Sequence, residues 1–255
     1  YLNKNCGNFS NIFNCDLVHA PMVDLSVFGT VIPENPFNLT LNEATKIGAD
    51  INVDYWLGFW GEPRLIYTAH EFRTGKYNNS NRRSIHLGID IFTNSGHKIS
   101  APLHGIVRTV ENRKSHLDYG GIVILEHSNN HGDKFYSLYG HLNPSVVDEL
   151  SVGQIIEKGE VFCELGSSNN NGGWAPHLHL QLSLSLECMD NNWPGVADPD
   201  EMNFWGKICP NPASLLNLPD NKTHYKKIDE KDILEKRKNN FGSNLKLSYE
   251  NPLMF

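Results

Sequence analysis

The sequence predicts an all-β protein: an antiparallel β-sandwich with a metal site in a groove, extended at both ends by short helices and loops. Two observations carry this prediction. Short apolar runs separated by Gly, Pro and Asn turns follow one another from Ser84 to Leu186, as in sandwiches. From Leu178 to Leu186 every second residue is leucine, which is typical of a strand with one buried face. Such sandwiches bury one face of each sheet and leave the other solvated or lining a groove.

The expected strands are short, and turn residues separate them. Their ranges are 104–110, 121–127, 134–138, 155–156 and 161–165. A further strand follows from the leucine alternation, and it carries His177 and His179. Residues i and i+2 of a strand share a face, so both imidazoles lie on one side, ~7 Å apart at Cα. The alternating leucines, Leu178 to Leu186, are expected on the other side.

A second histidine motif is the run His86-Leu87-Gly88-Ile89-Asp90. On a straight strand His86 and Asp90 would lie ~13 Å apart, too far for two short side chains to share one ion. A helix would bring them together, but the isoleucines and the internal glycine favour a strand. We therefore expect a strand that bends at Gly88.

These motifs offer two imidazoles and a carboxylate for a divalent metal, with one imidazole left for proton transfer. A catalytic zinc site has three protein ligands and an open water position. Each motif alone is more often a structural histidine, but their conjunction with Tyr139-Gly140-His141-Leu142 favours a metal site. No His-Glu-x-x-His helix occurs, so the thermolysin arrangement is absent.

Together these residues resemble the LytM-type (M23) zinc metallopeptidases, or peptidoglycan endopeptidases, from about Arg83 to Gln181. Besides the three histidine motifs, the resemblance rests on residues 96, 100–107, 119–120, 122–127, 153–154, 158–159 and 166.

The resemblance implies Zn²⁺ as cofactor, held by His86, Asp90 and His179, with His141 and His177 as catalytic residues. It implies a metal-activated water that attacks a peptide or amide bond in a peptide or peptidoglycan-like substrate. We expect the two catalytic histidines to orient and deprotonate that water, stabilise the oxyanion and protonate the leaving amine. How they divide this work stays open.

Five other histidines lack paired spacing, so surface or packing roles are expected. They are His97, His104, His116, His127 and His131. The loop 169–174 combines amides, glycines and a tryptophan. It suits a wall of a substrate cleft, and an ordinary turn is an equal alternative.

Composition limits the partners. The 255 residues carry a net charge of −7, which gives no electrostatic support to nucleic-acid binding. No apolar run approaches the roughly 20 residues of a membrane span. The five cysteines, an odd and scattered set, favour a reducing compartment. Cys6 and Cys15 could pair if the protein were exported.

We expect three regions: an N-terminal extension over 1–82 packed on the core, a metallopeptidase-like domain over 83–219, and a charged helix and linker over 220–255. The extension should hold a short capped helix after Thr40 and a strand over 64–68. Its aromatic residues Trp56, Phe59 and Trp60 pack against the core or, alternatively, line a groove. Residues 187–219 should be loop-rich and wrap the domain.

The C-terminal residues 245–255 resemble the leading segment of class III PLP-dependent aminotransferases. This implies a covalent fusion to a PLP-dependent domain after a charged helix over 220–240, and a cytoplasmic location. The chain begins at Tyr1, so a periplasmic or exported location follows instead if it is a processed fragment. The fusion also raises an alternative function: a metal-bearing substrate-recognition or regulatory module without hydrolytic activity. A structural spacer would make the site histidines incidental.

Overall fold

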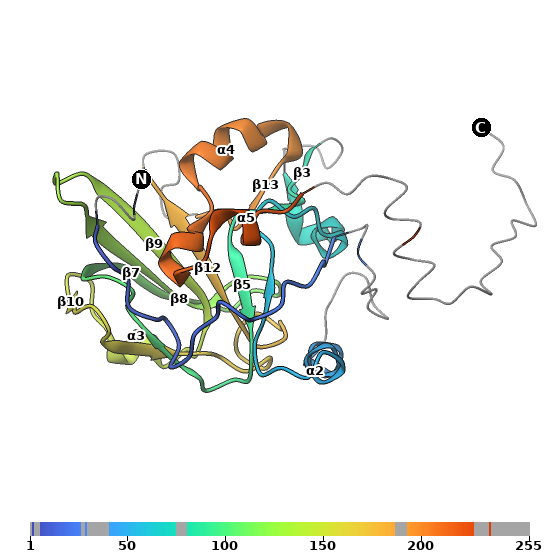
Figure 1. Ribbon diagram of the computed structural model, residues 1–255, viewed down its shortest axis with the longest axis horizontal. Helices are drawn as coiled ribbons and strands as arrows, with labels where there is room; N and C mark the ends of the chain where they lie inside the picture. Colours follow the sequence, from blue (N-terminus) through green and yellow to red (C-terminus); the bar gives the residue numbers. More distant parts are fainter. Residues whose placement is uncertain are drawn as a thin grey trace, which may run out of the picture.

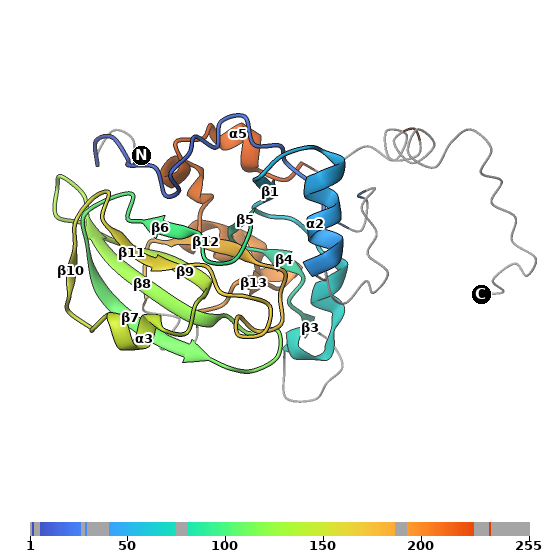
Figure 2. The same ribbon diagram turned by 90° about the horizontal axis from the view of Figure 1, so that it is seen from below.

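The computed structural model describes residues 6–26, 41–74, 81–186 and 193–226, with positions 2, 29 and 235. Its centre is a seven-stranded antiparallel sheet with the strand order β1-β5-β12-β9-β8-β7-β10 (Figures 1 and 2). The strands in that order are Trp56–Gly58, Ile89–Phe92, His177–Ser183, Lys134–Leu142, Gly120–Ser128, Gly105–Arg113 and Ile155–Ile156. The predicted all-β class is therefore confirmed.

Shorter elements surround the sheet. Three two-stranded pairs join β6 (Lys98–Ser100) to β11 (Val161–Glu164), β4 (Ile85–His86) to β13 (Val196–Ala197), and β2 (Arg73–Thr74) to β3 (Asn81–Arg82). The α-helices are α2 (Leu41–Asp50), α3 (Val146–Glu149), α4 (Met202–Ile208) and α5 (Asp220–Thr223). The 3-10 helices are η1 (Leu65–Thr68), η2 (His70–Phe72), η3 (Pro199–Glu201) and η4 (Pro212–Leu216). No helix in the described part of the chain combines the length and apolar character that a membrane crossing needs.

Apolar side chains cover both faces of the central strands. On one face Leu178, Leu180 and Leu182 of β12 join a large cluster with residues of β6, β11 and the N-terminal segment. On the other face a second cluster joins Ile122 and Ile124 of β8 to residues of the 193–209 region. The histidines of β12 point to this second face, as the period-two pattern predicts.

Four of the five strand ranges predicted between residues 104 and 165 agree closely with the observed bounds, and the fifth is longer than expected. The strand expected over 134–138 continues as β9 through Leu142 and so carries His141 in the sheet. Glycine at position 140 obscures this extension in the sequence, because glycine is rare in strands. Here Gly140 leaves room for a neighbouring ring: a Cβ there would lie 2.6 Å from Cδ1 of Tyr119.

The leucine alternation overstates the length of β12. The strand ends at Ser183, Leu184 is 47% exposed, and Leu186 packs against the second cluster instead of the first. Local hydrogen bonds explain the turn, because the Ser183 hydroxyl donates to the carbonyl of Ser185 at 2.7 Å. The prediction of one continuous leucine face is wrong beyond Leu182.

Three other expectations need correction or restriction. Residues 65–68 form the 3-10 helix η1 instead of a strand, because extended pairing stops at Arg64, which bridges to Ser26. Of the helix expected over 220–240, the described residues 220–226 are helical over α5 and leave the helix at His224, which bridges to Trp60, and position 235 is helical. Its remainder from 227 on, apart from position 235, and the aminotransferase-like residues 245–255 lie outside the described residues. Within the region 187–219, expected to be loop-rich, the described residues also form the helix α4 and the strand β13.

The N-terminal residues are built into the sheet. Strand β1 pairs with β5 and sets Gly58 opposite Asp90. Trp56 and Trp60 are buried, and Trp56 stacks on Phe92 with ring centroids 3.7 Å apart, so these two aromatics pack on the core, although Trp56 also borders a cavity of about 210 Å³. The helix expected after Thr40 is observed as α2, although Thr40 itself lies outside the described residues.

The described cysteines, Cys6, Cys15, Cys163 and Cys209, are free thiols, and Cys188 lies outside the described residues. Burial raises the pKa of Cys163 well above its usual range, so this thiol is unreactive.

One buried histidine away from the motifs makes stability depend on pH. Nδ1 of His127 donates to the carbonyl of His104 at 2.8 Å, so Nε2 accepts from the Ser137 hydroxyl at 2.7 Å. Burial lowers the pKa of His127 to about 4. The unfolded chain therefore takes up the proton first as the pH falls.

We predict that this histidine stabilises the fold fully above about pH 6.5 and that its contribution is lost by about pH 4. Between these pH values the metal-free wild type should lose up to about 3 kcal/mol more unfolding free energy than His127→Gln. Urea unfolding of both proteins across this range measures the difference. Parallel pH curves would contradict a neutral, buried His127.

Candidate active site

The sheet brings the five predicted site residues together on its second face. His86 comes from β4, Asp90 from β5, His141 from β9, and His177 and His179 from β12. The register pairs His179 with Asp90 on one side and with Gly140 on the other. Each of the five side chains is at most 5% exposed, so the site is closed to bulk water on most sides.

The chain bends where the sequence predicts. β4 ends at His86, Gly88 forms a bend, and β5 begins at Ile89. The bend leaves His86 Nε2 and Asp90 Oδ1 3.2 Å apart. Gly88 is also needed for space, because a Cβ there would lie 2.7 Å from Cε1 of His179.

Three ligand atoms form a nearly equilateral triangle. His86 Nε2 lies 3.0 Å from His179 Nδ1, and His179 Nδ1 lies 3.1 Å from Asp90 Oδ1, which closes the triangle at 3.2 Å. Neighbouring ligand atoms of a tetrahedral zinc ion, with bonds of about 2.0–2.1 Å, lie roughly 3.3 Å apart. The triangle has the size that such an ion requires.

Outer hydrogen bonds fix the tautomers of the two ligand imidazoles. Nδ1 of His86 lies 2.9 Å from the carbonyl of Phe59, which can only accept, so this nitrogen carries the proton. Nε2 of His179 lies 3.0 Å from Oε1 of Gln181. The orientation of that amide is set by its Nε2, which donates to the carbonyl of Pro194.

The triangle therefore consists of three unprotonated atoms that face one another. Burial, and then the Arg64 charge, lower the pKa of His86 to about 4, so its ring stays neutral at pH 7. Three converging lone pairs repel one another unless a cation lies between them. The residues present fit a divalent metal ion, and the nitrogen and oxygen donors suit zinc.

His141 and His177 lie beside this triangle as a pair, with ring centroids 4.3 Å apart. Nδ1 of His141 donates to the carbonyl of Asn171 at 3.0 Å, and Nδ1 of His177 donates to the carbonyl of Ala175 at 2.7 Å. In both rings Nε2 is left as the proton acceptor. Burial lowers the pKa of His177 and lowers that of His141 well below the usual range, so both are neutral bases.

His141 has a left-handed backbone, with φ of 64°. Non-glycine residues rarely adopt this conformation, and it clusters at functional sites. Two backbone hydrogen bonds hold it: His141 N–H donates to the carbonyl of Tyr119, and the carbonyl of His141 accepts from Gly166. The backbone thus aims a catalytic candidate at the triangle.

Two charged residues near the site are absent from the sequence prediction. Arg64 donates from Nη1 to Asp90 Oδ2 and from Nε to Glu62 Oε2. Burial alone would raise the pKa of Asp90, but His86 and Arg64 hold it well below its usual range. Because His86 is neutral at pH 7, Arg64 is the charge that keeps Asp90 ionised.

The sequence prediction of the site also lacks Gln181, and the sequence signals for these three residues differ. Gln181 stands two residues after His179, so the same period-two argument places it on the histidine face. Glu62 and Arg64 have no such signal, because they reach the site through long-range pairing: β1 pairs with β5, and backbone hydrogen bonds join residues 61–64 to residues 84–86.

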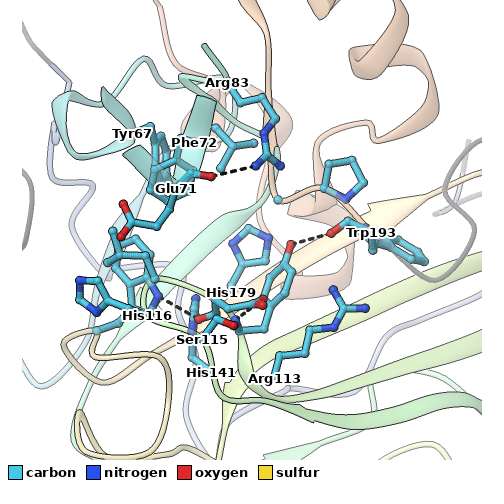
Figure 3. A pocket seen from close by; sticks show the side chains of 17 residues that line it. Tyr67, Glu71, Phe72, Arg83, Arg113, Ser115, His116, His141, His179 and Trp193 are labelled. Carbon is cyan, nitrogen blue, oxygen red and sulfur yellow. Dashed lines mark hydrogen bonds between the residues drawn. The ribbon is translucent and has the colours of Figure 1, made fainter. Parts of the chain in front are cut away.

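A cavity of about 360 Å³ opens onto the site, and His141 and His179 line it. Figure 3 shows Tyr67, Phe72 and Arg83 along one side of it and Ser115, His116 and Arg113 along the other. Trp174 of the loop 169–174 also lines the cavity. This position agrees with the interpretation of the loop as a wall of a substrate cleft. His116, expected to have a surface or packing role, borders the cavity too.

Comparison with known proteins points to one peptidase family. Residues 84–191 match peptidase family M23. The L-Ala--D-Glu endopeptidase of Bacillus subtilis (strain 168) is 31% identical over 135 residues, which cover 49% of this chain and 38% of that protein. The aligned part is thus well under half the length of this relative.

Solved structures give weaker similarities. The catalytic domain of lysostaphin from Staphylococcus simulans is 23% identical and covers 62% of this chain and 96% of its own, with a TM-score of 0.36. A zinc-containing peptidase from Vibrio cholerae is 21% identical over 49% of this chain and 36% of its own, with a TM-score of 0.32. At such scores, the assignment of the fold rests on the strands of this chain itself.

We predict that Gln181→Leu lowers zinc affinity about 10- to 100-fold, because His179 loses the acceptor that fixes its tautomer. Gln154→Leu, in which a half-buried glutamine far from the site loses its hydrogen bond to Ser151 N–H, serves as control. Chelator competition measures both affinities. Equal affinities in the two variants would contradict the role of Gln181.

Proposed function

We propose that this chain, whose residues 84–191 match peptidase family M23, is a zinc-dependent metallopeptidase that cleaves peptide or amide bonds of the peptidoglycan type. The observation that carries the proposal is the triangle of three unprotonated ligand atoms, with two neutral imidazoles beside it. In this proposal His86, Asp90 and His179 hold the metal, and His141 and His177 are catalytic.

A bound zinc ion would supply Lewis acidity, polarising the scissile carbonyl and acidifying a water molecule. The two free Nε2 atoms of His141 and His177 are placed to receive the proton of that water. Each ring is anchored at Nδ1 by a backbone carbonyl, so a protonated ring keeps its position. It can then donate to the oxyanion or to the leaving amine.

The cavity supports a peptide substrate. Its walls combine aromatic faces, such as Tyr67 and Trp174, with the charged groups of Arg83 and Glu71. Such walls give a peptide both apolar contacts and hydrogen-bond partners. The endopeptidase relative, named for the L-Ala–D-Glu bond, supports a bond of this kind in the substrate.

The fusion suggested by residues 245–255 is part of the same proposal. If these residues lead into a PLP-dependent domain, the protein works in the cytoplasm on soluble peptides or amides. A metal-bearing recognition module is then the alternative, with zinc bound and no hydrolysis across a panel of peptides and muropeptides.

We predict that His179→Ala loses both zinc and activity, because it removes a ligand. His141→Ala should keep about one zinc per chain but lose turnover by about 10²- to 10⁴-fold, the range for a general acid–base group. Zinc content of protein purified without added metal or chelator, and hydrolysis of muropeptides, measure the two effects.

Full activity in His141→Ala would contradict its catalytic role. Wild-type protein without zinc, and unable to take it up on reconstitution, would overturn the metallopeptidase itself. A wild type that binds zinc but hydrolyses none of the muropeptides would support the alternative function, a metal-bearing recognition module.

A further inference from the structure

The two oxygens of Asp90 have different surroundings. Oδ1 lies 3.2 Å from His86 Nε2, 3.1 Å from His179 Nδ1 and 3.7 Å from His177 Nε2, so it faces the triangle. Oδ2 points away from the triangle and accepts a hydrogen bond from Nη1 of Arg64. Only one oxygen of this carboxylate is thus directed at the metal position.

Buried contacts fix the position of Arg64, so that Oδ2 of Asp90 stays turned away from the triangle. Its side chain is 5% exposed, and its Nε donates at 2.6 Å to Glu62, which is fully buried. The other oxygen of Glu62 accepts from the backbone N–H of Leu25 at 2.8 Å. On the far side, the guanidinium packs against the backbone at Gly58, where a Cβ would lie 2.4 Å from Nη2.

Two of the three residues in these ion pairs lie outside the region that matches the peptidase family. Glu62 and Arg64 precede residue 84, where that match begins. Both follow β1, which pairs with β5 and sets Gly58 opposite Asp90, and both bond to the chain before Leu87: His86 N–H donates to the carbonyl of Glu62, and Arg64 N–H donates to the carbonyl of Ser84. The same segment gives His86 its acceptor, the carbonyl of Phe59.

A carboxylate can bind a metal through one oxygen or through both. In a catalytic zinc site with three protein ligands, the fourth position must stay open for water or substrate. A second oxygen from Asp90 would compete for that position. A cationic donor on Oδ2 prevents this, because turning Oδ2 toward the metal would break the buried ion pair between Asp90 and Arg64.

We propose that Arg64, anchored by Glu62, is a positioning residue that restricts Asp90 to one ligand oxygen and so keeps the fourth metal position open. This inference rests on the proposed metallopeptidase function. It assigns to the N-terminal segment a part of the metal site itself.

The test uses cobalt(II) in place of zinc, because the visible absorption of cobalt weakens as its coordination number rises from four. Removing Arg64 alone would strand the Glu62 carboxylate, so the main variant is the neutral pair Glu62→Gln with Arg64→Met. We expect the cobalt-loaded wild type to absorb strongly and this variant to lose intensity as Oδ2 joins the ligands.

Three further variants make the result specific. Arg64→Lys keeps a cation and should retain the wild-type spectrum, whereas Arg64→Gln should lose intensity as the neutral pair does. If the double variant does not fold, the visible spectrum of cobalt-loaded Arg64→Gln tests the proposal instead. Arg108→Met removes an exposed arginine of β7 and should leave the spectrum unchanged.

An unchanged spectrum in the neutral pair or in Arg64→Gln, with one cobalt bound, would overturn the proposal. So would a weakly absorbing wild type. A wild type that binds no cobalt would remove both this inference and the proposed function. A wild type with the strong spectrum that hydrolyses no peptide would overturn only the hydrolase.

Discussion

The register between β5 and β12 determines whether this molecule has a metal site. It sets His179 directly opposite Asp90, and the bend at Gly88 brings His86 to the same point. A shift of one residue would turn both histidines of β12 into the leucine core. The two buried faces of the sheet oppose such a shift, because leucine and histidine would exchange places. Burial of Leu178, Leu180 and Leu182 therefore fixes the position of the site chemistry.

Around this register, each site imidazole is oriented by a hydrogen bond that its ring N–H donates. Four acceptors, three of them backbone carbonyls, take the N–H of the four site histidines. Such orientation reduces the rearrangement needed when a metal or substrate binds. It also gives the loop 169–174 a second part in the site besides the tryptophan that lines the cavity. The carbonyl of Asn171, within that loop, decides which nitrogen of His141 is free.

Much of this site could be predicted from the sequence, since its signals are local. The spacing of His177 and His179 fixes their common face, and Gly88 permits the bend that His86 and Asp90 need. Gln181 follows from the same alternation. Other parts depend on pairing between distant segments. Arg64 reaches Asp90 because residues 56–64 pair with β5 and with residues 84–86. The left-handed backbone of His141 is fixed by Tyr119 and Gly166, and Leu184 leaves its expected face through hydrogen bonds at the strand end. No local pattern encodes these long-range contacts.

The position of β1 bears on how such a domain is inherited. A gene segment cut at residue 84 would keep all five site residues, yet it would leave β5 as an open edge that invites pairing with other chains. It would also remove the counter-charge of Asp90. Recombination that moved this unit between proteins would therefore conserve the site only if the joint lay upstream of Trp56. The inherited module is larger than the stretch that sequence similarity marks.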